Sequence, residues 1–265
     1  MTTPDTPSAA AARIVRTRTG DAAVYDEGAG TPLVAIHGLP GVARDFRWIA
    51  PVLSQKLRLI RVDMPAFGGT PLSTAPSPSV ASRARFIVDV ADALELDRFF
   101  VLGHSMGGPI AAQAAALLGD RARGLALISS VGPRPHVFYR RLRWLIAITP
   151  TMSGPLVRPW EMILARGFEN SGFRGPFNQG ACVHTMRCVR ALDFAAHRQT
   201  VGGLRCETLV SYCEDDPLIE PAVAGELAAL APKGPRLVFK AGAHNPQKSQ
   251  ANELGRAITD WIAPH

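Results

Sequence analysis

The sequence has little cysteine, few aromatic residues and no long uninterrupted apolar run. Its four cysteines, Cys182, Cys188, Cys206 and Cys213, form no CxxC pair, so we expect reduced, buried thiols and no metal-ligand cluster. No stretch of 18 consecutive apolar residues occurs, which argues against a transmembrane helix and a membrane partner. The first 12 residues lack the basic and apolar regions of a secretory signal, so we expect a cytoplasmic protein.

Acidic residues are outnumbered by basic ones, 22 to 29, and almost all of the resulting net charge of +7 comes from arginine. A basic balance can indicate a nucleic-acid partner. The excess is not concentrated in a tail, however, so we do not expect one. With 47% apolar residues the 265-residue chain can bury a sizeable core, and its length suits one large α/β domain carrying an inserted cap.

Short apolar runs alternate with helical patterns along most of the chain. This alternation predicts an α/β fold, with a mostly parallel central sheet and helices on both of its faces. Residues 14–18 and 22–26 flank a Thr-Gly-Asp turn and predict an antiparallel hairpin. The later runs lie at 33–36, 57–62, 99–102, 125–128, 208–212 and 237–240, and the clearest helical patterns at 82–94, 106–118, 222–230 and 251–262.

One region interrupts the alternation, because residues 133–204 contain no good central strand. They contain prolines, glycines, aromatic residues and broken helical stretches at 140–148 and 160–168. Such a segment is too long for a structureless loop inside a compact domain. We therefore expect a helical cap at 133–204, an α/β core at 13–132 and 205–265, and a flexible tail at 1–12.

The most informative motif is Gly103-His104-Ser105-Met106-Gly107, a G-x-S-x-G sequence. It follows an apolar run and opens a helix rich in small residues, which is the strand–turn–helix context of a nucleophile elbow. The tight turn would clash with side chains two residues on either side of the serine, which accounts for the two glycines. Ser105 is therefore the candidate nucleophile.

A serine nucleophile needs a base and a carboxylate that orients the base, in the chain order Ser, acid, His. Of the seven histidines, only His244 follows a late strand and precedes the last helix. The acid should end the preceding strand, where Asp215 and Asp216 are adjacent. We favour Asp216, and Asp215 remains an alternative.

An oxyanion hole needs two backbone N–H groups directed at the developing negative charge. Met106, the residue after the nucleophile, supplies one candidate. The loop His37-Gly38-Leu39-Pro40-Gly41 supplies the other, and Leu39 fits best because Pro40 has no N–H.

The chain resembles the α/β-hydrolase fold superfamily from about residue 13 to 263. The stretches that carry the resemblance are LVAIHGLPG, RLIRVDMPAFGGT, FFVLGHSMGG, YCEDDPLIEP and AGAHNPQ. They are similar to the branch that contains small esterases, carbon–carbon bond hydrolases, haloperoxidase-like esterases and proline iminopeptidases. The resemblance implies that Asp63 braces a loop and is not catalytic.

Several positions depart from the family pattern. The usual proline four residues after the acid is replaced by Glu220, and a usual glycine by Cys213, which keeps Asp215 open as the acid. A serine nucleophile argues against dehalogenases and epoxide hydrolases, which use aspartate. Leu39 replaces the second glycine of the iminopeptidase motif and argues against a peptidase.

We therefore predict a serine hydrolase that cleaves an ester or related carbonyl bond of a small molecule, with no cofactor and no metal. The sequence leaves the oligomeric state open. Two alternatives remain: a carbon–carbon bond hydrolase that uses the same serine and histidine, and a hydrolase-fold receptor whose triad has little turnover.

The cap region is strongly basic. One hypothesis is that one or two of its arginines bind an anionic substrate group, and the alternative is a solvated basic surface. The arginines are Arg134, Arg140, Arg141, Arg143, Arg158, Arg166, Arg174, Arg187, Arg190 and Arg198. The apolar residues expected to line an acyl pocket are Phe138, Trp144, Leu145, Met152, Trp160, Met162 and Phe168.

Overall fold

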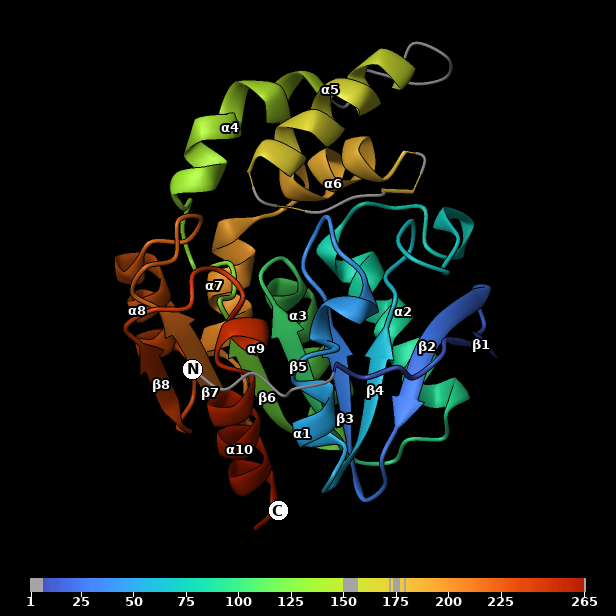
Figure 1. Cartoon of the computed structure of the whole chain (residues 1–265), viewed down its shortest axis with the longest axis vertical. Coiled ribbons are helices and arrows are strands. Elements are labelled where there is room, and N and C mark those ends of the chain that lie inside the picture. Colours follow the sequence, from blue (N-terminus) through green and yellow to red (C-terminus); the bar gives the residue numbers. More distant parts are fainter. Residues whose placement is uncertain (1–6, 150–156, 172, 174–176, 179, 265) are drawn as a thin grey trace.

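The computed structural model describes residues 7–149, 157–171, 173, 177–178 and 180–264. Within these ranges eight strands form one sheet in the order β1-β2-β4-β3-β5-β6-β7-β8 (Figure 1). The strands are β1 Arg13–Arg16, β2 Asp21–Glu27, β3 Thr31–Ile36, β4 Leu57–Val62, β5 Phe99–His104, β6 Ala122–Ile128, β7 Glu207–Cys213 and β8 Arg236–Phe239. β2 pairs antiparallel with β1 and β4, and all other neighbours are parallel. The predicted mostly parallel sheet and N-terminal hairpin are confirmed.

Helices cover both faces of the sheet. In β3, Val34 and Ile36 face the core formed with α2, α3 and α8, whereas Leu33 and Ala35 face the core formed with α1 and α10. Successive strand residues point to opposite faces, so a strand buried on both faces must be apolar throughout. The helices are α1 Ala50–Leu53, α2 Val80–Ala93, α3 Gly107–Leu118, α4 Val137–Ile148, α5 Val157–Asn170, α6 Ala181–Arg190, α7 Phe194–Gly202, α8 Pro221–Leu230, α9 Pro246–Ser249 and α10 Ala251–Ile262.

The strand order determines where a ligand can bind. β3 lies between β4 and β5. The chain therefore adds β4 on one side of β3 and then crosses over to add β5 on the other side. In open α/β sheets such a switch point creates a crevice at the carboxyl ends of the strands. The loop after β3 and the turn after β5, which carry Leu39 and Ser105, meet there.

The insertion between β6 and β7 is helical, as the sequence predicts. α4 and α5 pack on α6 around a small core of their own that includes Ile146, Leu164 and Met186. Figure 1 shows these three helices beyond the carboxyl ends of the parallel strands. α7 instead packs against α3 and α8, and its Val201 belongs to the main core. The cap segment expected from the sequence, residues 133–204, therefore includes one helix, α7, that packs with the core.

A buried arginine joins this insertion to the core. Arg83 of α2 has no exposed surface, and its Nε donates to Cys188 Sγ at 3.2 Å while a terminal nitrogen donates to the Pro65 carbonyl oxygen at 3.3 Å. Its guanidinium also contacts His184 of α6. All four cysteines are free thiols, and three of them are buried as expected, whereas Cys206 is partly exposed.

The N-terminal segment is in contact with the core from residue 8 onward. The Ser8 N–H donates to the Arg47 carbonyl oxygen at 2.8 Å, and its hydroxyl donates to Glu27 at 2.6 Å. Of the expected flexible tail, residues 1–6 lie outside the described ranges. No helix within those ranges is long and apolar enough to cross a membrane.

Candidate active site

The turn after β5 places Ser105 in a strained backbone conformation, with φ of 53°. A Cβ added to Gly103 would lie 2.4 Å from the Gly107 carbonyl oxygen, and one added to Gly107 would lie 2.4 Å from the Ile36 carbonyl oxygen. Only glycine fits such close backbone approaches. The two glycines therefore permit the sharp turn that lifts the Ser105 hydroxyl above the sheet edge.

We expect Gly107→Ala to destabilise the protein by about 1–3 kcal/mol. The new methyl group would meet the backbone carbonyl oxygens of Ile36 at 2.4 Å and His37 at 2.6 Å, and neither can rotate away. Gly167 of α5 is the matched control, because an added Cβ there meets no atom within 4 Å. Gly167→Ala should stabilise by about 0.5–1 kcal/mol. Urea unfolding measures both, and equal stabilities would contradict the close packing at Gly107.

Three side chains singled out in the sequence form one hydrogen-bonded chain. The Ser105 hydroxyl lies 2.8 Å from His244 Nε2, and His244 Nδ1 lies 2.8 Å from Asp216 Oδ2. With the proton on Nδ1 donated to the carboxylate, Nε2 is free to accept from the serine. The three residues follow β5, β8 and β7, so the sheet edge brings together positions 139 and 28 residues apart.

The Asp216 carboxylate is held ionised by its partners. Burial alone would raise the pKa of Asp216, but the hydrogen bond and charge of His244 and the backbone N–H groups of Leu218 and Ile219 lower it below its usual value. Oδ1 accepts from Leu218 N at 2.9 Å and from Ile219 N at 3.1 Å. These two bonds fix the carboxylate, so its other oxygen is directed at the imidazole.

Asp215, the alternative carboxylate, points elsewhere. Its two oxygens accept from the backbone N–H groups of Gly242 at 3.1 Å and Ala243 at 2.8 Å. Ala243 has a φ of 52°, a strained conformation directly before His244. Asp215 therefore braces the turn that presents the histidine.

The two predicted N–H donors lie beside the serine. Leu39 and Met106 line the same pocket as Ser105, and a Cβ on Gly38 would lie only 2.9 Å from Ser105 Cβ. Within the described ranges, neither the Leu39 nor the Met106 N–H donates to another residue. Both groups are thus available to a ligand atom at the serine.

The pocket at Ser105 is small and mainly apolar. Its cavity is about 30 Å³, room for about one water molecule. The insertion closes it, since Phe138, Phe173, Val189 and Leu192 line it together with core residues.

Two further buried histidines support the site and had no role in the sequence prediction. His104 Nε2 donates to the His244 carbonyl oxygen at 2.8 Å, and burial lowers the pKa of His104 to about 3, so its ring is neutral. His37 Nε2 accepts from Met64 N at 2.9 Å, while Nδ1 donates to the Gly38 carbonyl oxygen at 2.7 Å. In the sequence, the only indication of this supporting role is that each histidine is next to a glycine, Gly38 or Gly103.

Asp63 also acts on a loop. Its carboxylate accepts from Ala43 N at 2.7 Å and from Gly69 N at 2.9 Å, which agrees with the bracing role that the resemblance implied. In the described part of the chain, no group of three histidine, cysteine or acidic side chains is arranged to hold a metal.

Comparison with known proteins identifies the family. The sequence model of the α/β-hydrolase fold matches residues 31–150. A 2-hydroxy-6-oxo-2,4-heptadienoate hydrolase from Pseudomonas putida is 27% identical over 91% of this chain and 92% of its own length. The chain belongs to the α/β-hydrolase superfamily. It is an enzyme of the hydrolase class.

Two further matches span nearly the whole hydrolase. A pimeloyl-[acyl-carrier protein] methyl ester esterase from Photobacterium profundum is 27% identical over 89% of this chain and 96% of its own length. The structure of a meta-cleavage product hydrolase from Pseudomonas fluorescens superimposes with a TM-score of 0.74 at 23% identity, covering 95% of this chain and 97% of the other. The fold is therefore shared from end to end.

The described arginines of the insertion lie outside the Ser105 pocket of the hydrolase. None of those that the structure describes lines that pocket. Arg134 and Arg140 instead pair with Glu226 and Glu220 at 2.8 Å, and Arg174 lies outside the described residues. The solvated-surface interpretation fits these positions, and the hypothesis of a cap arginine in this pocket is not supported.

The predicted apolar lining was correct at one position and wrong at others. Phe138 lines the Ser105 pocket. Trp144 and Met162 are 72% and 70% exposed, and Phe168 is buried in the small core of the insertion. Met152 lies outside the described residues. Helical periodicity could not tell which face of α4 or α5 would turn inward.

Buried histidines should make the hydrolase sensitive to acid. Burial lowers the pKa of His104 and His184 to about 3 and of His136 and His197 to about 4, whereas unfolded histidines titrate near about 6.5. Below that pH the unfolded state binds protons that the folded state does not. The free energy of unfolding should therefore fall as the pH drops from about 6.5 to about 4, by up to about 1.4 kcal/mol per pH unit for each histidine.

Urea unfolding across this pH range measures the slope, and His197→Gln tests its origin. Glutamine can still donate to the Val131 carbonyl oxygen, which His197 Nε2 contacts at 3.0 Å, but it cannot titrate. The variant should show a shallower loss of stability toward acid. A stability independent of pH between 6.5 and 4 would contradict the neutral, buried histidines.

Proposed function

We propose that this enzyme is a serine hydrolase that cleaves an ester or related carbonyl bond of a small molecule. The observation that supports this best is the Ser105–His244–Asp216 chain, with 2.8 Å at each link. It begins on a strained elbow at a pocket of mainly apolar residues. This combination matches the needs of acyl transfer: an activated nucleophile, an oriented base and a shielded site.

In the first step, His244 Nε2 takes the proton from the Ser105 hydroxyl as Oγ attacks the substrate carbonyl carbon. Asp216 keeps the imidazole in the required tautomer and stabilises its positive charge. The N–H groups of Leu39 and Met106 stabilise the oxyanion of the tetrahedral intermediate. Collapse of this intermediate breaks the bond to the leaving oxygen, which receives the proton from His244.

In the second step, water attacks the acyl group on Ser105. His244 accepts a proton from the water and then returns it to Ser105 Oγ as the acid product leaves. Every proton and electron pair is accounted for by these residues and water. We further propose that α4, α5 and α6 form the cap that closes the pocket and selects the acyl group by shape and hydrophobicity.

Carbon–carbon bond hydrolysis is the second candidate. It is favoured by the similarity to the 2-hydroxy-6-oxo-2,4-heptadienoate hydrolase over 91% of the chain. The same serine, histidine and oxyanion donors could serve a vinylogous diketone. The two candidates differ in the leaving atom, which is oxygen for an ester and carbon for a diketone.

A paired assay separates the candidates. We expect hydrolysis of 4-nitrophenyl butyrate, followed by nitrophenolate release, with a kcat/KM well above that for a ring-cleavage dienoate of comparable size. The reverse ranking would assign carbon–carbon hydrolysis. Ser105→Ala is the control for both substrates, since either reaction depends on this residue.

A further inference from the structure

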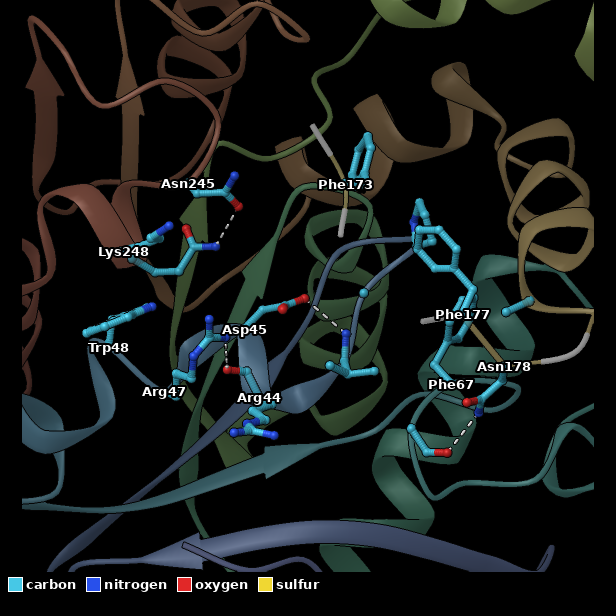
Figure 2. Close-up of a pocket in the computed structure, with 16 residues that line it drawn as sticks. Arg44, Asp45, Arg47, Trp48, Phe67, Phe173, Phe177, Asn178, Asn245 and Lys248 are labelled. Carbon is cyan, nitrogen blue, oxygen red and sulfur yellow. Dashed lines mark hydrogen bonds between the residues drawn. The ribbon is translucent and has the colours of Figure 1, made fainter. Parts of the chain in front are cut away.

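A larger cavity, of about 460 Å³, adjoins the Ser105 pocket, and its lining residues are drawn in Figure 2. Phe173 lines both. Pro40 and Asn245 line the cavity, and each directly follows a residue of the site, namely Leu39 and His244. The cavity therefore adjoins the oxyanion loop and the histidine turn.

One side of this cavity is basic. Arg47 and Lys248 line it, with Arg44 as a third cation, and in Figure 2 they lie across the cavity from Phe67 and Phe177. None of the three has a carboxylate within 4.0 Å among the described residues, although nine other basic side chains of that part do. Three cations without a carboxylate partner at one cavity produce a positive potential that attracts anions.

The acidic residue that lines the cavity does not neutralise this charge by pairing. Asp45 Oδ2 accepts from the Val42 N–H at 3.0 Å, so the carboxylate is bound to the oxyanion loop. The Arg47 guanidinium instead lies 5.5 Å from the ring centre of Trp48 and donates to the Arg44 carbonyl oxygen at 3.1 Å. Arg47 is thereby held in place with donors left for a ligand.

Two buried polar atoms on the same wall have no hydrogen-bond partner among the residues that the structure describes. They are Trp48 Nε1 and Gln247 Oε1, and both residues line the cavity. Gln247 is 1% exposed, and its Nε2 donates to Asn245 Oδ1 at 3.1 Å. Unpaired buried polar groups are costly and uncommon in folded proteins, and they mark places where a polar ligand group would be stabilised.

We propose that this cavity binds a carboxylate or phosphate carried by the leaving group of the substrate. Arg47 and Lys248 provide the positive charge, and Arg47 can grip such an oxyanion through two hydrogen bonds. This inference rests on the proposed serine-hydrolase function, and it specifies the substrate as an ester of an anionic alcohol.

The site has two parts, the pocket at Ser105 and the basic cavity, and this arrangement places the anion on the leaving group. The acyl group stays bound to Ser105 through the second step, so its carbonyl carbon lies in the mainly apolar pocket that contains Ser105. The leaving group must depart, and it receives its proton from His244. The basic cavity adjoins the histidine turn and is much larger than the acyl pocket, so it is the place for a departing group.

The test compares three chromogenic esters: 4-nitrophenyl butyrate, its 3-carboxy-4-nitrophenyl analogue with the charge on the leaving group, and mono-4-nitrophenyl glutarate with the charge on the acyl group. We expect the wild type to prefer the carboxylated leaving group about tenfold in kcat/KM at low salt, and this preference should decrease with ionic strength. The glutarate ester should show no such gain. Hydrolysis of a butyrate ester of a phosphorylated phenol, measured by the release of butyrate, shows whether the site prefers a phosphate or a carboxylate.

Arg47→Gln/Lys248→Gln should abolish the preference, so that the carboxylated and the neutral ester are hydrolysed with similar kcat/KM. Lys240→Gln/Arg256→Gln is the matched control, because it removes the same charge from exposed residues that do not line the cavity. The control should keep the preference. If it loses the preference equally, or if the wild type treats all three esters alike, the anion site is wrong while the serine mechanism stands.

A binding measurement is independent of turnover. Calorimetric titration of Ser105→Ala with 5-hydroxy-2-nitrobenzoate, the carboxylated leaving group, should show binding that weakens at least about fivefold in Arg47→Gln/Lys248→Gln. Single Lys248→Gln, at an exposed position, keeps the test valid if the double variant folds poorly. Equal affinity for 4-nitrophenol and 5-hydroxy-2-nitrobenzoate would contradict the anion site. This outcome does not depend on whether the proposed hydrolysis is correct.

Discussion

Ser105→Ala is expected to lose esterase activity by roughly 10⁴–10⁶-fold in kcat and to keep its fold. No other group in the pocket can form the acyl-enzyme, so only the oxyanion donors and substrate binding would remain. Alanine tolerates the φ of 53° no worse than serine does, and the position is only partly buried. The variant should therefore unfold in urea with nearly the wild-type midpoint.

Ser129→Ala is the matched control for this loss. Ser129 also follows a parallel strand, has a positive φ of 39° and is buried, but its hydroxyl has no hydrogen-bond partner in the described part of the chain. Its replacement should leave kcat/KM near the wild-type value. Initial rates with 4-nitrophenyl butyrate measure both variants. Substantial activity in purified Ser105→Ala, with contamination excluded, would contradict the assignment of the nucleophile.

Asp216→Asn should reduce kcat by roughly 10⁴-fold. An asparagine amide would donate to His244 Nδ1, which forces the ring proton onto Nε2, and that nitrogen could no longer accept the proton of Ser105. The imidazolium formed in the transition state would also lose the charge that stabilises it. The effect should appear in kcat, with a small change in KM, because the carboxylate does not line the pocket.

Asp215→Asn is the closest control, since it makes the same change one residue away. Asp215 accepts from two backbone N–H groups, and asparagine can still accept one of them. We expect a stability loss of about 1 kcal/mol and a kcat within about tenfold of the wild type. A larger loss of kcat for Asp215→Asn than for Asp216→Asn would mean that the orienting carboxylate is Asp215.

The sequence predicted the parts of the site that local rules determine. Gly103 and Gly107 lie two residues on either side of Ser105, between an apolar run and a helix of small residues. This pattern specifies the sharp turn of a nucleophile elbow. His244 and Asp216 were found because parallel strands place their carboxyl ends at one edge, so the residue after each strand reaches the same crevice. The alternating apolar runs predicted the sheet for the same reason.

The sequence could not predict features that depend on contacts between distant segments. The choice between Asp215 and Asp216 depends on which carboxylate meets two N–H groups of the 242–243 turn. The inward face of α4 depends on its packing against α6, so Trp144 was placed wrongly. Two cations that line the larger cavity, Arg47 and Lys248, lie in the core and not in the cap, where arginine is most frequent.

Covalent labelling with a fluorophosphonate probe tests the proposed mechanism most directly. Such probes react with a serine that is activated by a neighbouring base, so intact-mass analysis should show one adduct per chain and peptide mapping should place it on Ser105. Ser105→Ala should not react, and Asp216→Asn should react far more slowly. An adduct on another residue, or ester turnover by a protein that the probe does not label, would contradict a Ser105 nucleophile. Failure of both labelling and turnover would instead favour a receptor that keeps the fold without the reaction.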